Sequence, residues 1–369
     1  MIIHPSPIFN RNASLSPLLK GWLMVLCTLL PLSAQAQRSL ERGYASITEE
    51  RSRNMMEFLA DDLLEGRDAG MRGGQLAARY ITSLLREWGV APLPGEWNKQ
   101  GNEKLLTNLS YMQPFDVAQL TKPDRGPWQV HPDSIAKVKE RGAHRLRHLN
   151  NLLAYIPGKR TDEWVIVGAH YDHEGTFPDI ADDGIYNGAD DNASGVVAVL
   201  QMARAFVMSG EQPERSVIFA FWDGEEKGLL GSRHFVANCK FIDKVKCYLN
   251  FDMIGRGPAD NPKLVSYFFT ESHPAFGEWL TRDLRERGWC FEPSLRPWDN
   301  PVGGSDNGSF ARKGVPIIWY HTEGHPDYTR PSDTADKINY RKMTDICRAS
   351  FLTGWKMANE KARHIKLRP

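Results

Sequence analysis

Short apolar runs that alternate with helical patterns constrain the fold of this chain more than any other feature. From Asn151 onward the runs lie at 152–156, 164–169, 216–222, 247–251, 264–269 and 316–319. Runs this short and this continuously apolar are typical of strands buried on both faces. Helical patterns lie between and after them, at 194–206, 232–238, 274–287 and 342–361. We therefore predict an α/β fold, a three-layer α/β/α sandwich around a mostly parallel mixed sheet.

The first part of the mature chain is expected to be helical and then irregular. A helix begins near Thr48, and its apolar residues recur at helical spacing from Met55 to Leu64. A second helix is expected over 74–88 and ends before Gly89. Residues 92–147 are rich in proline, glycine and charge, so we expect loops, one or two edge strands and a loop or lid insertion there. The length allows one large domain or two smaller ones, and we expect 37–369 to form a single domain.

The first 36 residues have the parts of a secretory signal peptide. Arg11 and Lys20 precede an apolar run over 21–32, and Ala34-Gln35-Ala36 follows it. The run is short for a membrane span and contains Pro31. We expect a cleavable signal peptide over 1–36, a periplasmic or extracellular protein, and no stable membrane association after cleavage. The alternative is an uncleaved amphipathic anchor.

Charge and cysteine content exclude some classes of partner. The chain has 46 basic and 45 acidic residues, so it offers no general surface for polyanions, and we expect no nucleic-acid partner. The cysteines beyond the leader lack the Cys-x-x-Cys spacing of a structural zinc site. Export permits disulfides, so Cys239 and Cys247 are either paired or buried thiols. The sequence leaves the oligomeric state open.

Acidic residues and histidines follow the predicted strands at the points where they end. They occur in His170-Tyr171-Asp172-His173, Asp223-Gly224-Glu225-Glu226, Asp252, Asp190-Asp191-Asn192 and His321-Thr322-Glu323-Gly324-His325. Alone, each has an ordinary explanation: a surface histidine, a solvated acidic loop, a helix cap or a turn residue. Together they predict chemistry at the carboxyl edge of the sheet. Imidazoles and carboxylates in combination indicate a divalent metal site, with zinc favoured by the histidines.

The same segments resemble a family of secreted di-zinc exopeptidases, which includes bacterial leucine-type aminopeptidases and glutamate carboxypeptidases. The matching segments are Gly168-Ala169-His170-Tyr171-Asp172, Gly188-Ala189-Asp190-Asp191-Asn192-Ala193-Ser194-Gly195, Asp223-Gly224-Glu225-Glu226, Asn250-Phe251-Asp252-Met253-Ile254-Gly255 and His325-Pro326-Asp327-Tyr328. They extend from Asn151 to about Tyr340 in the order of the family. Leu64-Glu65-Gly66-Arg67 is similar to the family's opening segment. The resemblance implies a zinc aminopeptidase-like fold.

The resemblance also implies two zinc ions per chain and the residues that hold them. His170, Asp191 and Asp252 would hold one ion. Asp191, Glu226 and His325 would hold the other, so that the Asp191 carboxylate bridges both. Two ions of this kind lower the pKa of a shared water molecule and polarise the carbonyl group to be cleaved.

Two further residues receive roles by the same comparison. Asp172 resembles the carboxylate that orients a metal-binding imidazole, and Glu225 resembles the general base that takes a proton from water. Adjacent side chains diverge on an extended or turning segment, so Glu226 can hold a metal while Glu225 faces the water. The resemblance also implies a cis peptide bond between Asp191 and Asn192.

Several positions in this assignment have a competitor. His321 competes with His325 for the last ligand position, and we favour His325 because Gly-His-Pro-Asp-Tyr resembles the family's form. His173 competes with His170, and Asp190 is next in line for Asp191. Ser305-Asp306-Asn307 resembles a Ser-Asp-His segment of the family with Asn307 in the histidine position. Asn307 and Tyr328 are candidates for contacts with the substrate or with the developing oxyanion.

The expected function is therefore that of a metallo-exopeptidase acting on peptide substrates, in particular an aminopeptidase. One alternative is a glutaminyl cyclase, an acyltransferase of the same fold that uses one zinc ion. The intact segment Asp191-Asn192-Ala193-Ser194-Gly195 favours the peptidase. The other alternative is a non-catalytic binding relative, which predicts that metal ligands are missing, and none of the five is.

Overall fold

The computed structural model describes residues 35, 37–95, 108–299 and 303–360. The predicted signal peptide, 1–36, lies outside the described residues except for residue 35. Within the described ranges, the helices are all too short or too polar to cross a membrane. The four cysteines in these ranges are free thiols, and Cys247 and Cys347 are buried.

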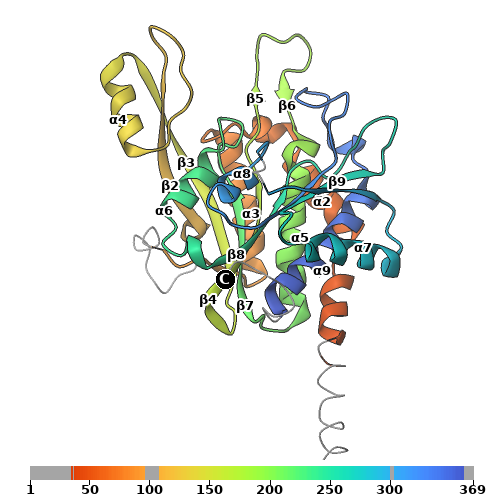
Figure 1. The fold of residues 1–369 in the computed structure, drawn as a ribbon. Helices are drawn as coiled ribbons and strands as arrows, with labels where there is room; N and C mark the ends of the chain where they lie inside the picture. Colours follow the sequence, from red (N-terminus) through yellow and green to blue (C-terminus); the bar gives the residue numbers. More distant parts are fainter. Residues whose placement is uncertain (1–34, 36, 96–107, 300–302, 361–369) are drawn as a thin grey trace, which may run out of the picture.

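A nine-stranded mixed sheet forms the centre of the described structure (Figure 1). Its strand order is β1-β3-β7-β4-β8-β11-β9-β10, and β2 pairs with β3. The strands are β1 (Ala91–Pro92), β2 (Met112–Leu120), β3 (His144–Ile156), β4 (Arg160–His170), β7 (Arg215–Trp222), β8 (Val245–Phe251), β9 (Leu264–Phe269), β10 (Glu292–Pro297) and β11 (Ile317–His321). The four central strands β7, β4, β8 and β11 are parallel to one another, and β10 is parallel to β9. The β3–β7 and β11–β9 pairs are antiparallel. Two short strands, β5 (Gly175–Thr176) and β6 (Ile185–Tyr186), pair separately.

Helices cover both faces of the sheet, which confirms the three-layer prediction. The larger layer contains α2 (Glu49–Leu59), α3 (Arg72–Glu87), α5 (Gly195–Ser209), α7 (Ala275–Arg287) and α9 (Tyr340–Asn359). The smaller layer contains α6 (Leu230–Asn238) and α8 (Asn307–Ala311). Along β4, Val165 and Val167 face the larger layer and Ile166 faces the smaller one. Because every second residue points to the opposite face, a strand covered on both sides must be apolar throughout.

All six apolar runs of the sequence form strands, and the helical patterns between them form α5, α6, α7 and α9. The segment 92–147 is more regular than expected. β2 pairs with β3 from Met112↔Leu152 to Leu120↔His144, and the helix α4 (Pro132–Arg141) connects them. The sequence did not predict this helix. Only Val138 of α4 is buried, so the helix has no apolar face that would show in the sequence.

The parallel strands end together, and this edge carries the candidate site. β4 ends at His170, β7 at Trp222 and β8 at Phe251, and the acidic segments follow directly. The turn Ala189–Ser194, which leads into α5, lies at the same edge. Residues distant in the sequence thus become neighbours because their strands run in the same direction.

Candidate metal centre

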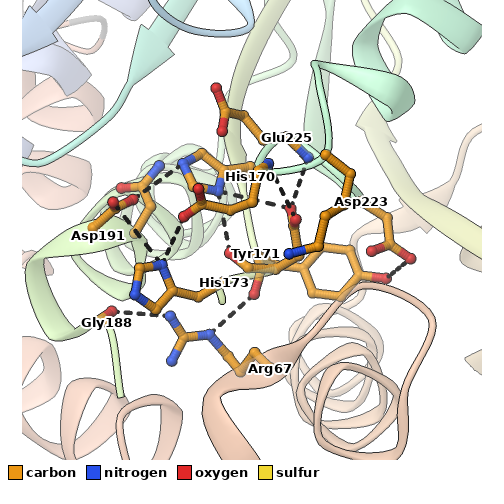
Figure 2. A network of polar contacts seen from close by, with 12 residues as sticks. Arg67, His170, Tyr171, His173, Gly188, Asp191, Asp223 and Glu225 are labelled. Carbon is orange, nitrogen blue, oxygen red and sulfur yellow. Dashed lines mark hydrogen bonds and ion pairs between the residues drawn. The ribbon is translucent and has the colours of Figure 1, made fainter. Parts of the chain in front are cut away.

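His170, Asp191 and Asp252 form a compact buried group at this edge. Figure 2 shows His170 and Asp191 side by side. The Nε2 atom of His170 lies 3.4 Å from Asp191 Oδ1 and 3.6 Å from Asp252 Oδ1. Two ligand atoms about 2.1 Å from a tetrahedral zinc ion lie about 3.4 Å apart. The spacing of these three side chains therefore fits a shared metal ion.

A second group contains Asp191 again, together with Glu226 and His173. His173 Nδ1 lies 2.7 Å from Glu226 Oε1 and 3.9 Å from Asp191 Oδ2. In each group the ligand atoms all lie within 4.8 Å of one another. Asp191 thus takes part in both groups, as the bridging role requires.

The structure brings four of the five predicted metal ligands together and places His325 apart. Within the described residues, the close groups of ligand atoms include His170, Asp191, Glu226 and Asp252 but not His325. His325 is buried, and its Nε2 atom lies 3.3 Å from Asp190 Oδ2. Its competitor His321 has Nδ1 2.7 Å from the carbonyl oxygen of Asp252. In the sequence His173 competes only with His170, whereas the structure places His173 beside Glu226, in the second group.

Asp172 connects the loop after β4 with the loop after β7. Its Oδ1 accepts the backbone N–H of Glu225 at 3.0 Å, and its Oδ2 accepts that of Glu226 at 3.3 Å. Toward His170 the closer contact is from Nδ1 to the Asp172 carbonyl oxygen, at 3.2 Å, and Oδ1 is 3.7 Å away. The Asp172 carboxylate is therefore placed to orient the two glutamates as well as to face the imidazole.

The electrostatics of this edge favour a bound cation. Burial, and then the negative charges of Glu226 and Asp252, raise the pKa of Asp191 well above its usual range. Burial also raises the pKa of Glu225, to which the charge of Asp252 contributes. Burial opposes ionisation of Glu226 as well, but the hydrogen bond and charge of His173 lower its pKa to about 2. Buried carboxylates this close to one another, with imidazole nitrogens among them, form a donor set that suits zinc.

The turn that carries Asp191 is fixed to the end of β8 by side-chain hydrogen bonds. Asn192 donates from Nδ2 to the carbonyl oxygen of Phe251 and accepts at Oδ1 from the N–H groups of Gly195 and Met253. A Cβ atom at Gly195 would lie 2.3 Å from Asn192 Oδ1, so only glycine fits there. The Asp191-Asn192 peptide bond is cis, as the resemblance implies.

Comparison with known proteins agrees with these motifs. Residues 151–352 match the model of peptidase family M28. The chain belongs to this family. "Leupeptin-inactivating enzyme 1" of Streptomyces exfoliatus is 31% identical over 51% of this chain, but over only 38% of its own length. "Probable leucine aminopeptidase 1" of Trichophyton verrucosum is 30% identical, over 73% of this M28 chain and 77% of its own.

Solved structures share the fold at low sequence identity. The zinc aminopeptidase BSAP from Bacillus subtilis is 17% identical, with a TM-score of 0.60 over 86% of this chain and 98% of its own. A glutaminyl cyclase from Fimbriiglobus ruber is 18% identical, with a TM-score of 0.60 over 85% and 96%. The M28 fold therefore does not by itself distinguish peptidase from cyclase.

Two residues that support the M28 site were not assigned a role from the sequence. Arg67 is 1% exposed, and its guanidinium donates to the carbonyl oxygens of Tyr171 at 3.0 Å and Gly188 at 2.9 Å, and to two more at Leu59 and Asn187. Burial lowers its pKa to about 10, which leaves it charged at neutral pH. Asp333 accepts at Oδ2 from the N–H groups of Asp190 and Asp191, at 2.9 and 3.1 Å. Arg67 thus joins the loop after β4 to Gly188, and Asp333 holds the Asp191 turn.

The two candidates for substrate contacts lie in different surroundings. Tyr328 is 49% exposed, and partial burial and then the charges of Asp191, Glu226 and Asp252 raise its pKa to about 12. Asn307 is fully buried, and Asn250 Nδ2 donates to its Oδ1 at 3.4 Å. Tyr328 is therefore open to solvent near the carboxylates, whereas Asn307 belongs to the polar interior beside β8.

Proposed function

We propose that this M28 chain is a zinc-dependent exopeptidase of the aminopeptidase type, which releases N-terminal residues from peptides. One observation carries the proposal: the two oxygens of the Asp191 carboxylate face two different histidines. Oδ1 lies 3.4 Å from His170 Nε2, and Oδ2 lies 3.9 Å from His173 Nδ1. A carboxylate with a nitrogen donor near each oxygen is suited to bridge two metal ions.

The donor groups divide between two ions. His170, Asp252 and Asp191 would hold one zinc ion, and Asp191 and Glu226, with one more histidine, would hold the second. The sequence predicts His325 for that last position. Bound zinc ions supply polarisation of the scissile carbonyl group and a lowered pKa of the attacking water.

Glu225 is the residue we assign to proton transfer. The Asp172 carboxylate holds its backbone N–H, which fixes the start of its side chain next to Glu226. Its carboxylate can approach within 4.8 Å of ligand atoms of His170 and Glu226. A carboxylate in this position can take a proton from water and then give it to the leaving amine.

We also propose that the protein is exported and acts on peptides outside the cytoplasm. The leader segment 1–36 supports export. The balanced charge gives no reason to expect a nucleic-acid partner.

The test compares Glu225→Gln with the wild type on unblocked and N-blocked peptides, with zinc measured by elemental analysis. The wild type should release N-terminal residues from unblocked peptides only and contain about two zinc ions per chain. Glu225→Gln should retain the zinc and lose about 10²–10⁴-fold or more in kcat, because an amide cannot accept the proton. Glu278→Gln, an exposed position on α7, is the matched control and should be fully active.

The cyclase alternative has a distinct outcome in the same assay. It is favoured by the shared fold of the F. ruber glutaminyl cyclase. Pyroglutamate formed from a peptide with N-terminal glutamine, with one zinc ion per chain and no peptide cleavage, would establish the cyclase and overturn the peptidase.

A further inference from the structure

We propose that His173, and not His325, is the histidine that completes the second metal position. The inference rests on the proposed two-zinc function and concerns one ligand of that site. It departs from the residue that the family resemblance implies, so the chain would hold its second ion with a histidine three residues after His170.

The His173 ring faces the second group of ligand atoms. Its Nδ1 atom lies 2.7 Å from Glu226 Oε1 and 3.9 Å from Asp191 Oδ2, and these are the two carboxylates assigned to the second ion. The side chain is fully buried, and Figure 2 shows its ring next to Asp191. Both of these contacts are made by Nδ1, while Nε2 has no hydrogen-bond partner within the described residues.

The backbone around His173 holds this ring in place. The backbone N–H of His173 donates to the Arg67 carbonyl oxygen at 3.1 Å. Gly188 has a positive φ of 55°, and a Cβ atom there would lie 2.5 Å from His173 Cδ2. The Arg67 guanidinium in turn donates to the Gly188 carbonyl oxygen. A Cβ atom at position 188 would also lie 2.0 Å from the Asp191 carbonyl oxygen, so a larger residue there would clash with both the Asp191 backbone and the imidazole. Arg67 contacts both sides of this arrangement, through its carbonyl oxygen to His173 and through its guanidinium to Gly188.

The competing histidine, His325, lies beside a different carboxylate. His325 Nε2 lies 3.3 Å from Asp190 Oδ2, and the other oxygen of Asp190 accepts the backbone N–H of Gly255 at 2.6 Å. Asp190 precedes the bridging Asp191, and Asp333 holds the backbone N–H groups of both. His325 therefore lies beside Asp190 and outside the close groups of ligand atoms, and we assign it a positioning role at this turn.

The experiment measures zinc binding to full-length mature protein rather than activity alone. The variants are His173→Ala and His325→Ala, with His148→Ala as the matched control, because His148 is an exposed histidine on β3. Loss of a residue that only orients a ligand costs about 10–100-fold in metal affinity, so loss of a ligand should cost more than about 100-fold. We expect His173→Ala to retain one tight zinc ion and to bind the second more than about 100-fold more weakly. His325→Ala should retain two zinc ions, with binding weakened by at most about 10–100-fold, and His148→Ala should bind both ions as the wild type does.

Cysteine variants keep the test independent of any folding defect in His173→Ala. A thiolate is a zinc and cobalt ligand, so His173→Cys should restore the second ion. With Co²⁺ in place of zinc, His173→Cys should show a thiolate-to-cobalt charge-transfer band, and His325→Cys should not. Circular dichroism of each metal-free variant reports whether the fold is retained.

The outcomes separate this inference from the function on which it rests. A wild type with two zinc ions, normal binding in His173→Ala and loss of one ion in His325→Ala would overturn the assignment of His173 alone. A charge-transfer band in His325→Cys but not in His173→Cys would do the same. A wild type that binds fewer than two ions would overturn the two-zinc function and this inference together.

Discussion

The carboxylate of Asp172 accepts the backbone N–H of Glu225 at 3.0 Å, so a residue at the end of one strand positions the proposed general base at the end of the next. The same carboxylate accepts the N–H of Glu226 through its other oxygen. Asp172 is therefore placed to orient both the proposed general base and a proposed metal ligand. This relationship leads to the first prediction.

Asp172→Asn should lower kcat by about 10–100-fold and weaken zinc binding moderately, because the amide keeps one acceptor and presents an N–H₂ group to the other backbone donor. A positioning role should also shift the pH profile of kcat, since the surroundings of Glu225 change. Steady-state kinetics across pH, with zinc titration, measure both effects. An unchanged pH profile with a full loss of zinc would mean that Asp172 acts only through His170.

Arg67→Ala should destabilise the fold by at least about 3 kcal/mol, because it leaves several buried carbonyl groups without their charged donor. Arg67→Lys should be intermediate, since an ammonium group keeps the charge but cannot reach all four carbonyl oxygens. Urea unfolding of the metal-free proteins measures the difference. Arg72→Ala, at an arginine whose side chain is 75% exposed, serves as the control and should change stability little.

Asp191→Ala should lower zinc occupancy at both positions, because the two groups of donors share this carboxylate. Asp190→Ala is the comparison variant, since Asp190 contacts His325 and lies outside the two groups of metal-donor atoms. We expect Asp190→Ala to retain both ions. Elemental analysis after dialysis measures the zinc content of both variants. Full zinc occupancy in Asp191→Ala would mean that Asp190, and not Asp191, is the bridging residue.

Asp327→Asn should lower the free energy of unfolding by about 1–2 kcal/mol at pH 7. Lys337, then Ser332 and Arg256, donate to this carboxylate and hold its pKa well below the usual range. A lowered pKa in the folded state contributes stability above the unfolded-state value of about 3.9, and this contribution disappears as pH falls below it. The difference between wild type and variant should therefore shrink from pH 5 downward in denaturant titrations. A difference that stays constant to pH 2 would show that lost packing, rather than charge, is responsible.

The strands and most of the site could be predicted from the sequence because the relevant signals are local. A run such as 164–169 is apolar along its whole length, and the polar residues begin where it ends, at His170. Parallel pairing then brings such ends together without further information. The helix α4 has no comparable signal, since its one buried residue is Val138.

The roles of Arg67 and the histidines depended on packing that no local pattern records. The sequence does not distinguish a buried arginine from an exposed one, and the partners of Arg67 lie up to 121 residues away along the chain. His173 directly follows one segment that matches the family and His325 begins another, and only the three-dimensional arrangement places one beside Glu226 and the other beside Asp190.

Strand β3 has two halves with different surroundings. Residues 152–156 pair with β7 in the central sheet, whereas residues 144–152 pair with β2, so that only Leu152 belongs to both ladders. The far end of this arm has its own apolar cluster, formed by Ala118, Leu120 and Val138. A change of length in the connection through α4 therefore lies outside the pairing of β3 with β7, which sets the register of the central strands. This makes the α4 connection a suitable position for attaching a reporter or an affinity tag to the enzyme.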